Sequence, residues 1–213
     1  MSVSRGLRMS EIEIIGFELS VYVRAVRLAC EEKGVPYRLV PVRPHEGEAA
    51  RLHPFGKIPV LRDGDFVLCE SRAIAGYLDE AFDGPRLFPE DRILKARVEE
   101  WVSFVNTTID PTMMRRYYVE LILPTGEGGV PNRDVIEPLL PAMQRQIGVI
   151  DRALEASGWL VGPDLTYADL NIYPVLAYFR QSPHGRPMVD AAPAVLDFMA
   201  RMDARDSVKR VCA

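Results

Sequence analysis

Ser20 is the first of three places in this 213-residue chain where the residue types could do chemistry. It lies between a predicted strand and a predicted helix, at the helix end that exposes about half an elementary positive charge. Redox proteins with a βαβ unit place a Cys-x-x-Cys pair here because the helix terminus lowers the pKa of a thiol. Here the pair is Ser20 and Val23, which excludes disulfide exchange and suits a thiolate brought by another molecule. The alternative is that Ser20 only caps the helix.

The second place is the segment Lys57-Ile58-Pro59-Val60, directly before a predicted hairpin. Proline is unusual in a strand except at its start or at an edge. A cis Ile58–Pro59 bond would turn the backbone N–H and C=O of Ile58 outward, where they could pair with an extended peptide ligand. Since only about 5–6% of X–Pro bonds are cis, the spacing alone favours a trans proline that begins the strand.

The third place is Glu70-Ser71, at the start of another predicted helix. Backbone N–H groups and the Ser71 hydroxyl would form an anion site there, and Glu70 could accept a hydrogen bond from an ammonium group. Together they would hold the zwitterionic end of an α-amino acid. The alternative is ordinary helix capping with an acidic first turn.

Hydrophobic patterning predicts a small α/β domain that would position these segments. Residues 11–17 and 37–42 are predicted strands, joined by a helix over residues 21–33 that Gly34 ends. Asp63-Gly64 joins two short strands, residues 58–62 and 65–68, in a hairpin, and residues 71–81 follow as a helix. Residues 41–51 are polar and irregular in pattern. We expect a flexible leader over residues 1–10, with Met9 a possible natural start, and the domain over residues 11–83.

The rest of the chain predicts helices only. A linker over residues 84–92, rich in Asp, Gly and Pro, precedes an all-helical domain over residues 93–213. Residues 92–123 form a long helical stretch that we expect to be interrupted or kinked near Pro111. A mobile loop is predicted over residues 124–133, and further helices over residues 138–156, 167–180 and 194–204. The fold class is therefore α/β followed by all-α.

The composition excludes several classes of protein. The formal net charge is −4, and the basic residues are interleaved with acidic ones, which argues against nucleic-acid binding. No apolar run approaches the roughly 18 residues of a membrane span. Cys30, Cys69 and Cys212 are too widely spaced for a disulfide framework or a zinc site, so we expect no metal and a cytoplasmic location.

The combination of the three segments on this scaffold resembles the glutathione S-transferases. The runs FELSVYVRAVRLACEEKGVPY, HPFGKIPVL and DGDFVLCESRAIAGYLDE are similar to the family's three blocks in its first domain. WLVGPDLTYADLNIYPVL is similar to its block in the second domain, where Thr166 and Asp169 form a structural capping box. The resemblance spans about residues 11–210 and implies a thioredoxin-like domain followed by an all-helical domain, in a homodimer.

The resemblance also implies roles for single residues. Ser20 falls where serine-type members (theta-, phi-, tau- and zeta-like) keep the hydroxyl that stabilises the glutathione thiolate. Pro59 is expected to be cis, so that Ile58 presents its backbone to glutathione. Glu70 and Ser71 fall on the clamp for the γ-glutamyl group. Two further positions point to the glycyl end, Lys57 and, as a looser match, His45, for which a plain surface histidine is the alternative.

Two departures from the family pattern narrow the subclass. Val21 replaces the proline that often follows the serine, and the Ser-Ser-Cys run of zeta-type isomerases is absent, which disfavours maleylacetoacetate isomerisation. Tyr22 is a rival hydroxyl two residues into the helix, and Ser20 is preferred.

A pocket for the electrophile is expected between the two domains, a common location for ligand sites. Its far wall would come from the first helix of the second domain, with Tyr22 contributed by the first domain. The candidates on that helix recur at helical spacing: Asn106, Asp110, Met113, Met114 and Tyr117. The alternative for Met114, Tyr117 and Tyr118 is that they are interhelical core.

These expectations describe a cytoplasmic, homodimeric glutathione transferase that detoxifies small hydrophobic electrophiles, with glutathione as cosubstrate. Two alternatives stay open. The chain could be a glutathione-binding or dimerisation module without turnover, or a glutathione-dependent peroxidase at the same site. The identity of the electrophile does not follow from the sequence.

Overall fold

A computed structural model of the chain describes residues 11–212. The chain divides into two compact units, with the boundary between Phe82 and Asp83. The predicted leader and the possible start at Met9 lie outside the described residues. No helix among the described residues is both long and apolar enough to cross a membrane.

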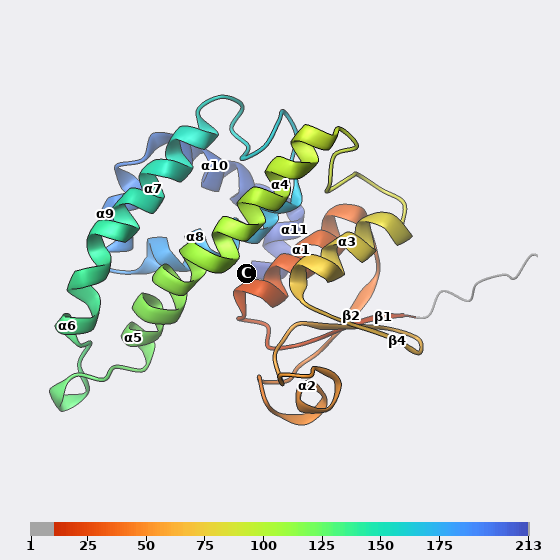
Figure 1. Ribbon diagram of the computed structural model, residues 1–213, viewed down its shortest axis with the longest axis horizontal. Coiled ribbons are helices and arrows are strands. Elements are labelled where there is room, and N and C mark those ends of the chain that lie inside the picture. The colour runs from red at the N-terminus through yellow and green to blue at the C-terminus, as the bar shows by residue number, and fades with distance from the viewer. Residues whose placement is uncertain (1–10, 213) are drawn as a thin grey trace, which may run out of the picture. The chain divides into compact units, whose positions relative to one another are not determined.

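The first unit is a four-stranded sheet with helices on both faces (Figure 1). The strands stand in the order β2-β1-β3-β4, with β2 parallel and β3 antiparallel to β1. Helices α1 and α3 pack together on one face, and α2 lies on the other. The elements in chain order are β1 (Ile12–Ile15), α1 (Val21–Lys33), β2 (Tyr37–Val40), α2 (Gly47–Leu52), β3 (Val60–Asp63), β4 (Phe66–Cys69) and α3 (Ser71–Ala81).

The predicted signals account for most of these elements. Gly34 ends α1 in the left-handed conformation, with φ at 69°, and its N–H donates to the carbonyl of Glu31. A hairpin joins β3 to β4, as predicted, but its two-residue turn is Gly64-Asp65, because Asp63 still pairs with Phe66. Lys33 and Asp79, both with fully buried side chains, form an ion pair at 3.2 Å between α1 and α3.

The register of the sheet aligns four residues, one on each strand. Val40 at the end of β2 pairs with Ile15 at the end of β1, Ile15 pairs with Val60 at the start of β3, and Val60 pairs with Cys69 at the end of β4. The loops that leave or enter the strands at these four residues therefore emerge at one edge of the sheet. We call Val40, Ile15, Val60 and Cys69 the terminal row.

Helix α2 corrects the expectation that residues 41–51 are irregular. Gly47–Leu52 form a helix of 6 residues with no side-chain cap at its start. A helix this short has little stability alone, because nucleation is costly and few hydrogen bonds repay it. Its stability comes from tertiary contacts, which the hydrophobic pattern does not contain.

The second unit is helical, and no strand occurs within its described residues 83–212. Its main helices are α4 (Arg92–Phe104), α5 (Val119–Ile122), α6 (Arg133–Ile136), α7 (Leu140–Leu154), α8 (Tyr167–Gln181), α9 (Gly185–Asp190), α10 (Pro193–Asp203) and α11 (Asp206–Cys212). Residues predicted as a linker take part in this unit's core. Leu87 and Phe88 are buried, and the Leu87 carbonyl accepts a hydrogen bond from the Tyr167 N–H at 3.0 Å.

The α-helix is interrupted near Pro111, as expected, although the chain stays helical from α4 to α5. Two π-helical segments, η1 (Val105–Ile109) and η2 (Pro111–Tyr118), widen the helix around the proline. Proline supplies no N–H, and the wider π-helical turns accommodate the missing hydrogen bond. The Gln146 side-chain amide donates to the Thr108 carbonyl at 3.2 Å, which satisfies one carbonyl of the widened region.

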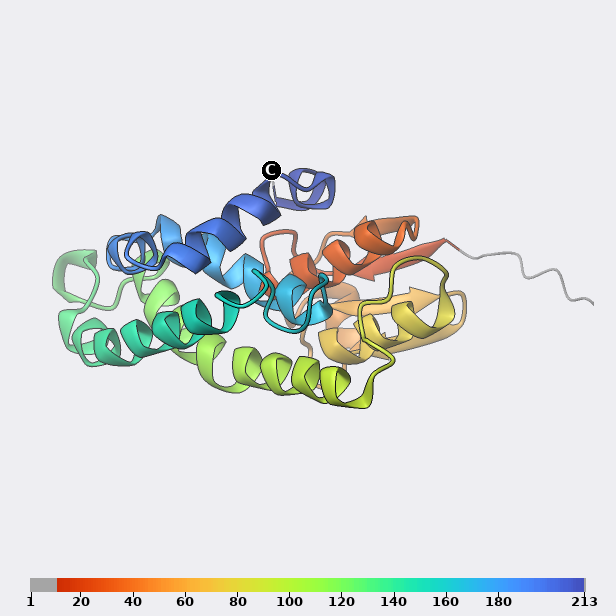
Figure 2. The same cartoon turned by 90° about the horizontal axis from the view of Figure 1, so that it is seen from above.

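Helix α8 is the core of the second unit. Figure 2 shows it among the other helices of this unit, where it contacts α4, α9, α10 and η2. Thr166 and Asp169 form the capping box at its start. Asp169, completely buried, accepts hydrogen bonds from the N–H groups of Leu160 and Thr166 and from the Thr166 hydroxyl.

Candidate functional site

The terminal row brings the three sequence-predicted segments of the first unit to one edge of the sheet. The chain runs from Ile15 into the loop that holds Ser20, from Pro59 into Val60, and from Cys69 into Glu70. Residues 41–46, which contain His45, leave β2 at the same row. All four loops therefore begin or end along this row.

Ser20 occupies the N-cap of α1, with extended backbone angles, and is partly exposed. Its N–H donates to the Phe17 carbonyl at 2.9 Å, and its own carbonyl accepts from the Arg24 N–H at 2.9 Å. The hydroxyl makes no capping hydrogen bond. Arg24 further holds this loop, since its Nε donates to the Glu18 carbonyl at 3.2 Å. The loop is fixed by backbone contacts, and the hydroxyl remains available to a ligand.

Tyr22, the rival hydroxyl, lies inside the first turn of α1 and is half-buried. It takes part in contacts within the protein. Its position beyond the N-cap sets it apart from Ser20, which stands at the exposed positive end of the helix.

The Ile58–Pro59 peptide bond is cis, as the resemblance implies. Pro59 is buried, and Ile58 is half-buried directly before β3. Glu70, the N-cap of α3, has a positive φ of 71°, which is uncommon for a residue with a side chain. Ser71 is buried at the first position of α3. The clamp residues therefore combine an exposed carboxylate with a buried helix start.

His45 and Lys57 lie on two loops that are hydrogen-bonded to each other. The His45 N–H donates to the Gly56 carbonyl at 2.6 Å, beside Lys57, and both His45 and Lys57 are exposed. His45 has a positive φ of 65°. Arg43, on the same loop as His45, stacks over the ring of Phe17 at 5.1 Å and so links this loop to the one that carries Ser20.

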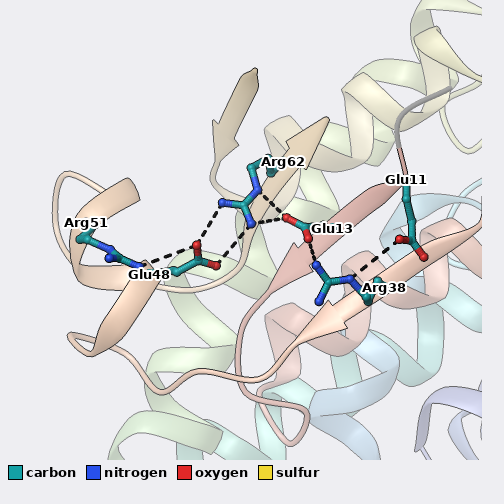
Figure 3. Close-up of polar contacts among 6 residues, drawn as sticks. All are labelled: Glu11, Glu13, Arg38, Glu48, Arg51 and Arg62. Carbon is teal, nitrogen blue, oxygen red and sulfur yellow. Dashed lines mark hydrogen bonds and ion pairs between the residues drawn. The ribbon is translucent and has the colours of Figure 1, made fainter. Parts of the chain in front are cut away.

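The sequence analysis missed several residues that support this edge. Glu13 on β1 contacts Arg38 of β2 and Arg62 of β3, and the Arg62 Nη1 lies 3.1 Å from the Glu48 Oε1 of α2. Figure 3 shows that these ion pairs continue to Glu11 at one end and to Arg51 at the other. The alternation of Glu11 and Glu13 with isoleucines along β1, visible as a strand pattern, is the signal that could have indicated this charged face.

His53 is a second residue that the analysis missed. It is buried at the end of α2, and its Nε2 lies 3.5 Å from the Glu70 Oε1. A single histidine in a loop has no periodicity, and only its place at the head of the block HPFGKIPVL signalled it.

The thiols of this unit are poor nucleophiles. Burial is the main cause that raises the pKa of Cys30, and burial followed by the charge of Glu70 raises the pKa of Cys69. Cys69 also makes a long contact from its Sγ to the Leu52 carbonyl at 3.7 Å. A reactive thiolate at this edge would have to come from a ligand.

The candidates on the second unit lie on the widened helix. Met113 and Tyr117 are fully buried, and the Tyr117 hydroxyl contacts Ser182 at 3.0 Å and the His184 Nδ1 at 3.1 Å. These contacts favour the interhelical-core alternative for Tyr117. Met114 is buried, with 8% of its surface exposed.

The two polar candidates on this helix, Asn106 and Asp110, differ in how fully their side-chain oxygens are hydrogen-bonded. The Asn106 Oδ1 accepts from the Asn171 side chain at 3.0 Å. The Asp110 Oδ2 accepts from the Arg115 Nε at 3.0 Å, whereas its Oδ1 is buried and has no hydrogen-bond partner. Asp110 is thus the candidate with hydrogen-bonding capacity left. Within residues 11–212, no three His, Cys, Asp or Glu side chains are arranged to hold a metal ion.

Comparisons with known proteins agree with this geometry. Residues 14–86 match the family described as Glutathione S-transferase, N-terminal domain, and residues 136–212 match Glutathione S-transferase, C-terminal domain. The chain belongs to the glutathione S-transferase family. Among curated relatives of this glutathione S-transferase, Glutathione S-transferase 1 of Triticum aestivum is 34% identical, over 96% of this chain and 94% of the wheat protein.

Solved structures are similar as well. Glutathione S-transferase I from maize, in complex with an atrazine glutathione conjugate, has a TM-score of 0.82 at 28% identity and covers 95% of this chain and 96% of its own. A glutathione S-transferase from Methylobacillus flagellatus with glutathione bound has a TM-score of 0.77 at 25% identity and covers 94% and 98%. The expected family, the thioredoxin-like and helical fold class, and the transferase class of enzyme are confirmed.

Proposed function

We propose that this glutathione S-transferase is of the serine type and uses Ser20 to hold the sulfur of glutathione as a thiolate. The observation that carries the proposal is the terminal row, which gathers the Ser20 loop, the Ile58–Pro59 segment and the Glu70-Ser71 helix start at one sheet edge. In this arrangement Ile58 pairs with the cysteinyl backbone, Glu70 and Ser71 bind the γ-glutamyl end, and Lys57 and His45 face the glycyl carboxylate.

One hydrogen bond and one helix terminus can supply the free energy needed to form the glutathione thiolate. A free thiol has a pKa of about 8.5, and lowering it by two units requires about 2.7 kcal/mol of preferential stabilisation of the anion. A hydrogen bond from the Ser20 hydroxyl to a charged sulfur supplies about 1.5–3 kcal/mol. The N-terminus of α1 adds about 0.3–1 kcal/mol. These contributions suffice without a histidine base.

The chemical step follows from the anion. The thiolate attacks an electrophilic carbon, a C–S bond forms, and the leaving group departs with its electron pair. Asn106, Asp110 and Met114 are the proposed lining for the electrophile on the second unit, whereas Met113 and Tyr117 are assigned to its core. Among these residues, Asp110 has the best support as a contact for the substrate, because its Oδ1 is buried and has no hydrogen-bond partner.

The proposal extends to a cytoplasmic homodimer that detoxifies small electrophiles. Phe55 and Phe66 expose much of their rings on the first unit, and exposed aromatic surface of this kind supports an interface. Sedimentation velocity would test the dimer, which should have about twice the mass of the 23.9 kDa chain.

Conjugation of chlorodinitrobenzene by wild type and by Ser20→Ala tests the central role. Loss of the hydroxyl should lower kcat/KM about 10- to 100-fold and raise the pKa of bound glutathione, because one hydrogen bond to the thiolate is removed. Ser20→Thr, which keeps a hydroxyl, should retain more activity, and Ser103→Ala on the exposed face of α4 is a control.

The same assay separates the alternatives. Equal rates in wild type and Ser20→Ala would remove Ser20 from the mechanism. No conjugation by either, with glutathione still bound, would favour the module without turnover. Reduction of cumene hydroperoxide in place of conjugation would favour the peroxidase.

A further inference from the structure

His53 lies behind the γ-glutamyl clamp and contacts it from inside the protein. Its side chain is only 3% exposed, whereas that of Glu70 is 69% exposed. The imidazole Nε2 lies 3.5 Å from the Glu70 Oε1. A buried ring thus meets the carboxylate of an otherwise solvent-exposed clamp residue.

The other ring nitrogen determines which atom faces Glu70. The Phe55 backbone N–H donates to the His53 Nδ1 at 3.0 Å, so Nδ1 is an acceptor and carries no hydrogen. The hydrogen of the neutral ring is then on Nε2, the nitrogen next to the carboxylate. The ring therefore offers a donor to Glu70.

His53 is fixed by its backbone and by the contact of its ring with Phe55, whereas the Glu70 side chain is exposed. The His53 N–H donates to the Ala49 carbonyl at 3.0 Å, and its carbonyl accepts from the Gly56 N–H at 2.9 Å. Glu70 stands at a positive φ on the N-cap, with a long side chain directed to solvent. Fixing such a side chain costs conformational entropy, which a preformed contact reduces before the ligand arrives.

We propose that His53 is a positioning residue, which holds the Glu70 carboxylate where the α-ammonium of glutathione binds. This inference rests on the proposed function, in which Glu70 is the acceptor for that ammonium. His53 acts through Glu70 and does not touch the reacting sulfur. It should therefore affect recognition of glutathione far more than the chemical step.

Two substitutions divide the ring's contacts between them. Asn places an amide oxygen near the position of Nδ1, so His53→Asn keeps an acceptor for the Phe55 N–H and loses the contact with Glu70. Gln places an amide nitrogen near the position of Nε2, so His53→Gln keeps the donor to Glu70 and loses the acceptor. Comparing the two variants separates a role in positioning Glu70 from a role in supporting the loop that contains Phe55.

The experiment compares glutathione with an analogue whose α-amino group is replaced by hydrogen. Dissociation constants from calorimetry and KM and kcat for chlorodinitrobenzene conjugation are measured for wild type, His53→Asn, His53→Gln, Glu70→Ala and Lys57→Ala. Wild type should prefer glutathione about 10- to 100-fold, the range expected for a hydrogen bond between charged groups. Glu70→Ala should abolish the preference.

The expected outcome is that His53→Asn reduces the preference to within about threefold with kcat little changed, while His53→Gln retains most of it. Lys57→Ala should weaken both ligands equally, because it acts at the glycyl end. Thermal unfolding checks that each variant is folded.

Three outcomes would overturn the inference in different ways. A His53→Asn variant that discriminates as well as wild type, while Glu70→Ala does not, would refute the positioning role alone. Undiminished discrimination by Glu70→Ala would refute the clamp itself, and with it the proposed role of Glu70. A loss confined to His53→Gln would assign His53 to support of the loop.

Discussion

Ser20 and Thr166 both occupy the N-cap of a long helix, and they use their hydroxyls differently. The Thr166 hydroxyl donates to the Asp169 Oδ2 at 3.0 Å inside a buried capping box. The Ser20 hydroxyl makes no capping bond. A hydroxyl whose hydrogen is committed within the protein cannot stabilise a ligand's anion, so the same position has a structural role in one helix and suits catalysis in the other.

Asp169 makes stability depend on pH. Burial raises its pKa to about 6, and the hydrogen bonds from Leu160 and Thr166 only partly oppose this. The folded state therefore binds a proton more tightly than the unfolded state, and the stabilising contribution is complete below about pH 4 and lost as pH rises through about 6. The shift of about two units corresponds to about 3 kcal/mol.

The comparison that checks this is wild type against Asp169→Asn, unfolded by urea at several pH values. The difference in free energy of unfolding between the two should shrink by about 3 kcal/mol from pH 4 to pH 7, since Asn does not titrate. A difference that is constant or grows over this interval would contradict the assigned protonation.

Residue types and family blocks identified Ser20, Glu70 and Ser71 from sequence because each begins a predicted helix. They could not identify His53, whose importance depends on the distance from its Nε2 to a residue 17 positions away. Nor could they distinguish Tyr117 as core from Tyr117 as pocket, since a helical period is common to both.

Helix α2 is an element whose stability depends on tertiary contacts. Its 6 residues have no side-chain cap, and the Arg62–Glu48 ion pair ties them to β3. The loop before it carries His45. The ion pair therefore connects a strand of the core to a proposed contact of the glycyl end.

Arg62→Met should loosen α2 with little loss of global stability, because partly exposed ion pairs contribute about 1 kcal/mol or less. Amides of residues 47–52 should exchange hydrogen faster, and KM for glutathione should rise about two- to fivefold with kcat nearly unchanged. Hydrogen-exchange mass spectrometry and steady-state kinetics measure the two effects.

Arg38→Met is the matched control for this substitution. Arg38 also contacts Glu13 but makes no ion pair with α2. Faster exchange of α2 in both variants would show that Glu13, and not the link from Arg62 to Glu48, anchors the helix.

The long helix from α4 to α5 illustrates a limit of local rules. A proline inside a helix predicts an interruption, which here takes the form of π-helical turns around Pro111, and the Gln146 side chain donates to the Thr108 carbonyl. Gln146, one of the partners of the Thr108 carbonyl, lies on α7, and the local sequence does not specify this contact.

For the molecule as a whole, sequence predicted the two fold classes and their order but not the terminal row. Alternation of residues identifies a strand, whereas register depends on which strand is its neighbour, and β1 pairs with β3 across 44 intervening positions, from Ile15 to Val60. The proposed glutathione contacts all lie in the first unit, at that row.

Glutathione should therefore stabilise the folded chain. At a concentration of about 100 times its Kd, binding adds about 2.7 kcal/mol, which should raise Tm by about 5 °C or more for a chain of this length. Differential scanning fluorimetry measures the shift. Glu70→Ala should show a much smaller one at the same concentration, and equal shifts would exclude the clamp from binding.

The raised pKa values of Cys30 and Cys69 bear on how easily the electrophilic substrate alkylates the enzyme itself. A catalyst that concentrates alkylating agents exposes its own sulfur atoms to them at every turnover. Because these two thiols stay protonated at neutral pH, the nucleophile that reacts is the sulfur of glutathione, which leaves the enzyme as part of the product. We therefore expect Cys30 and Cys69 to be alkylated more slowly than an exposed thiol, so that the electrophile consumes glutathione in place of the protein.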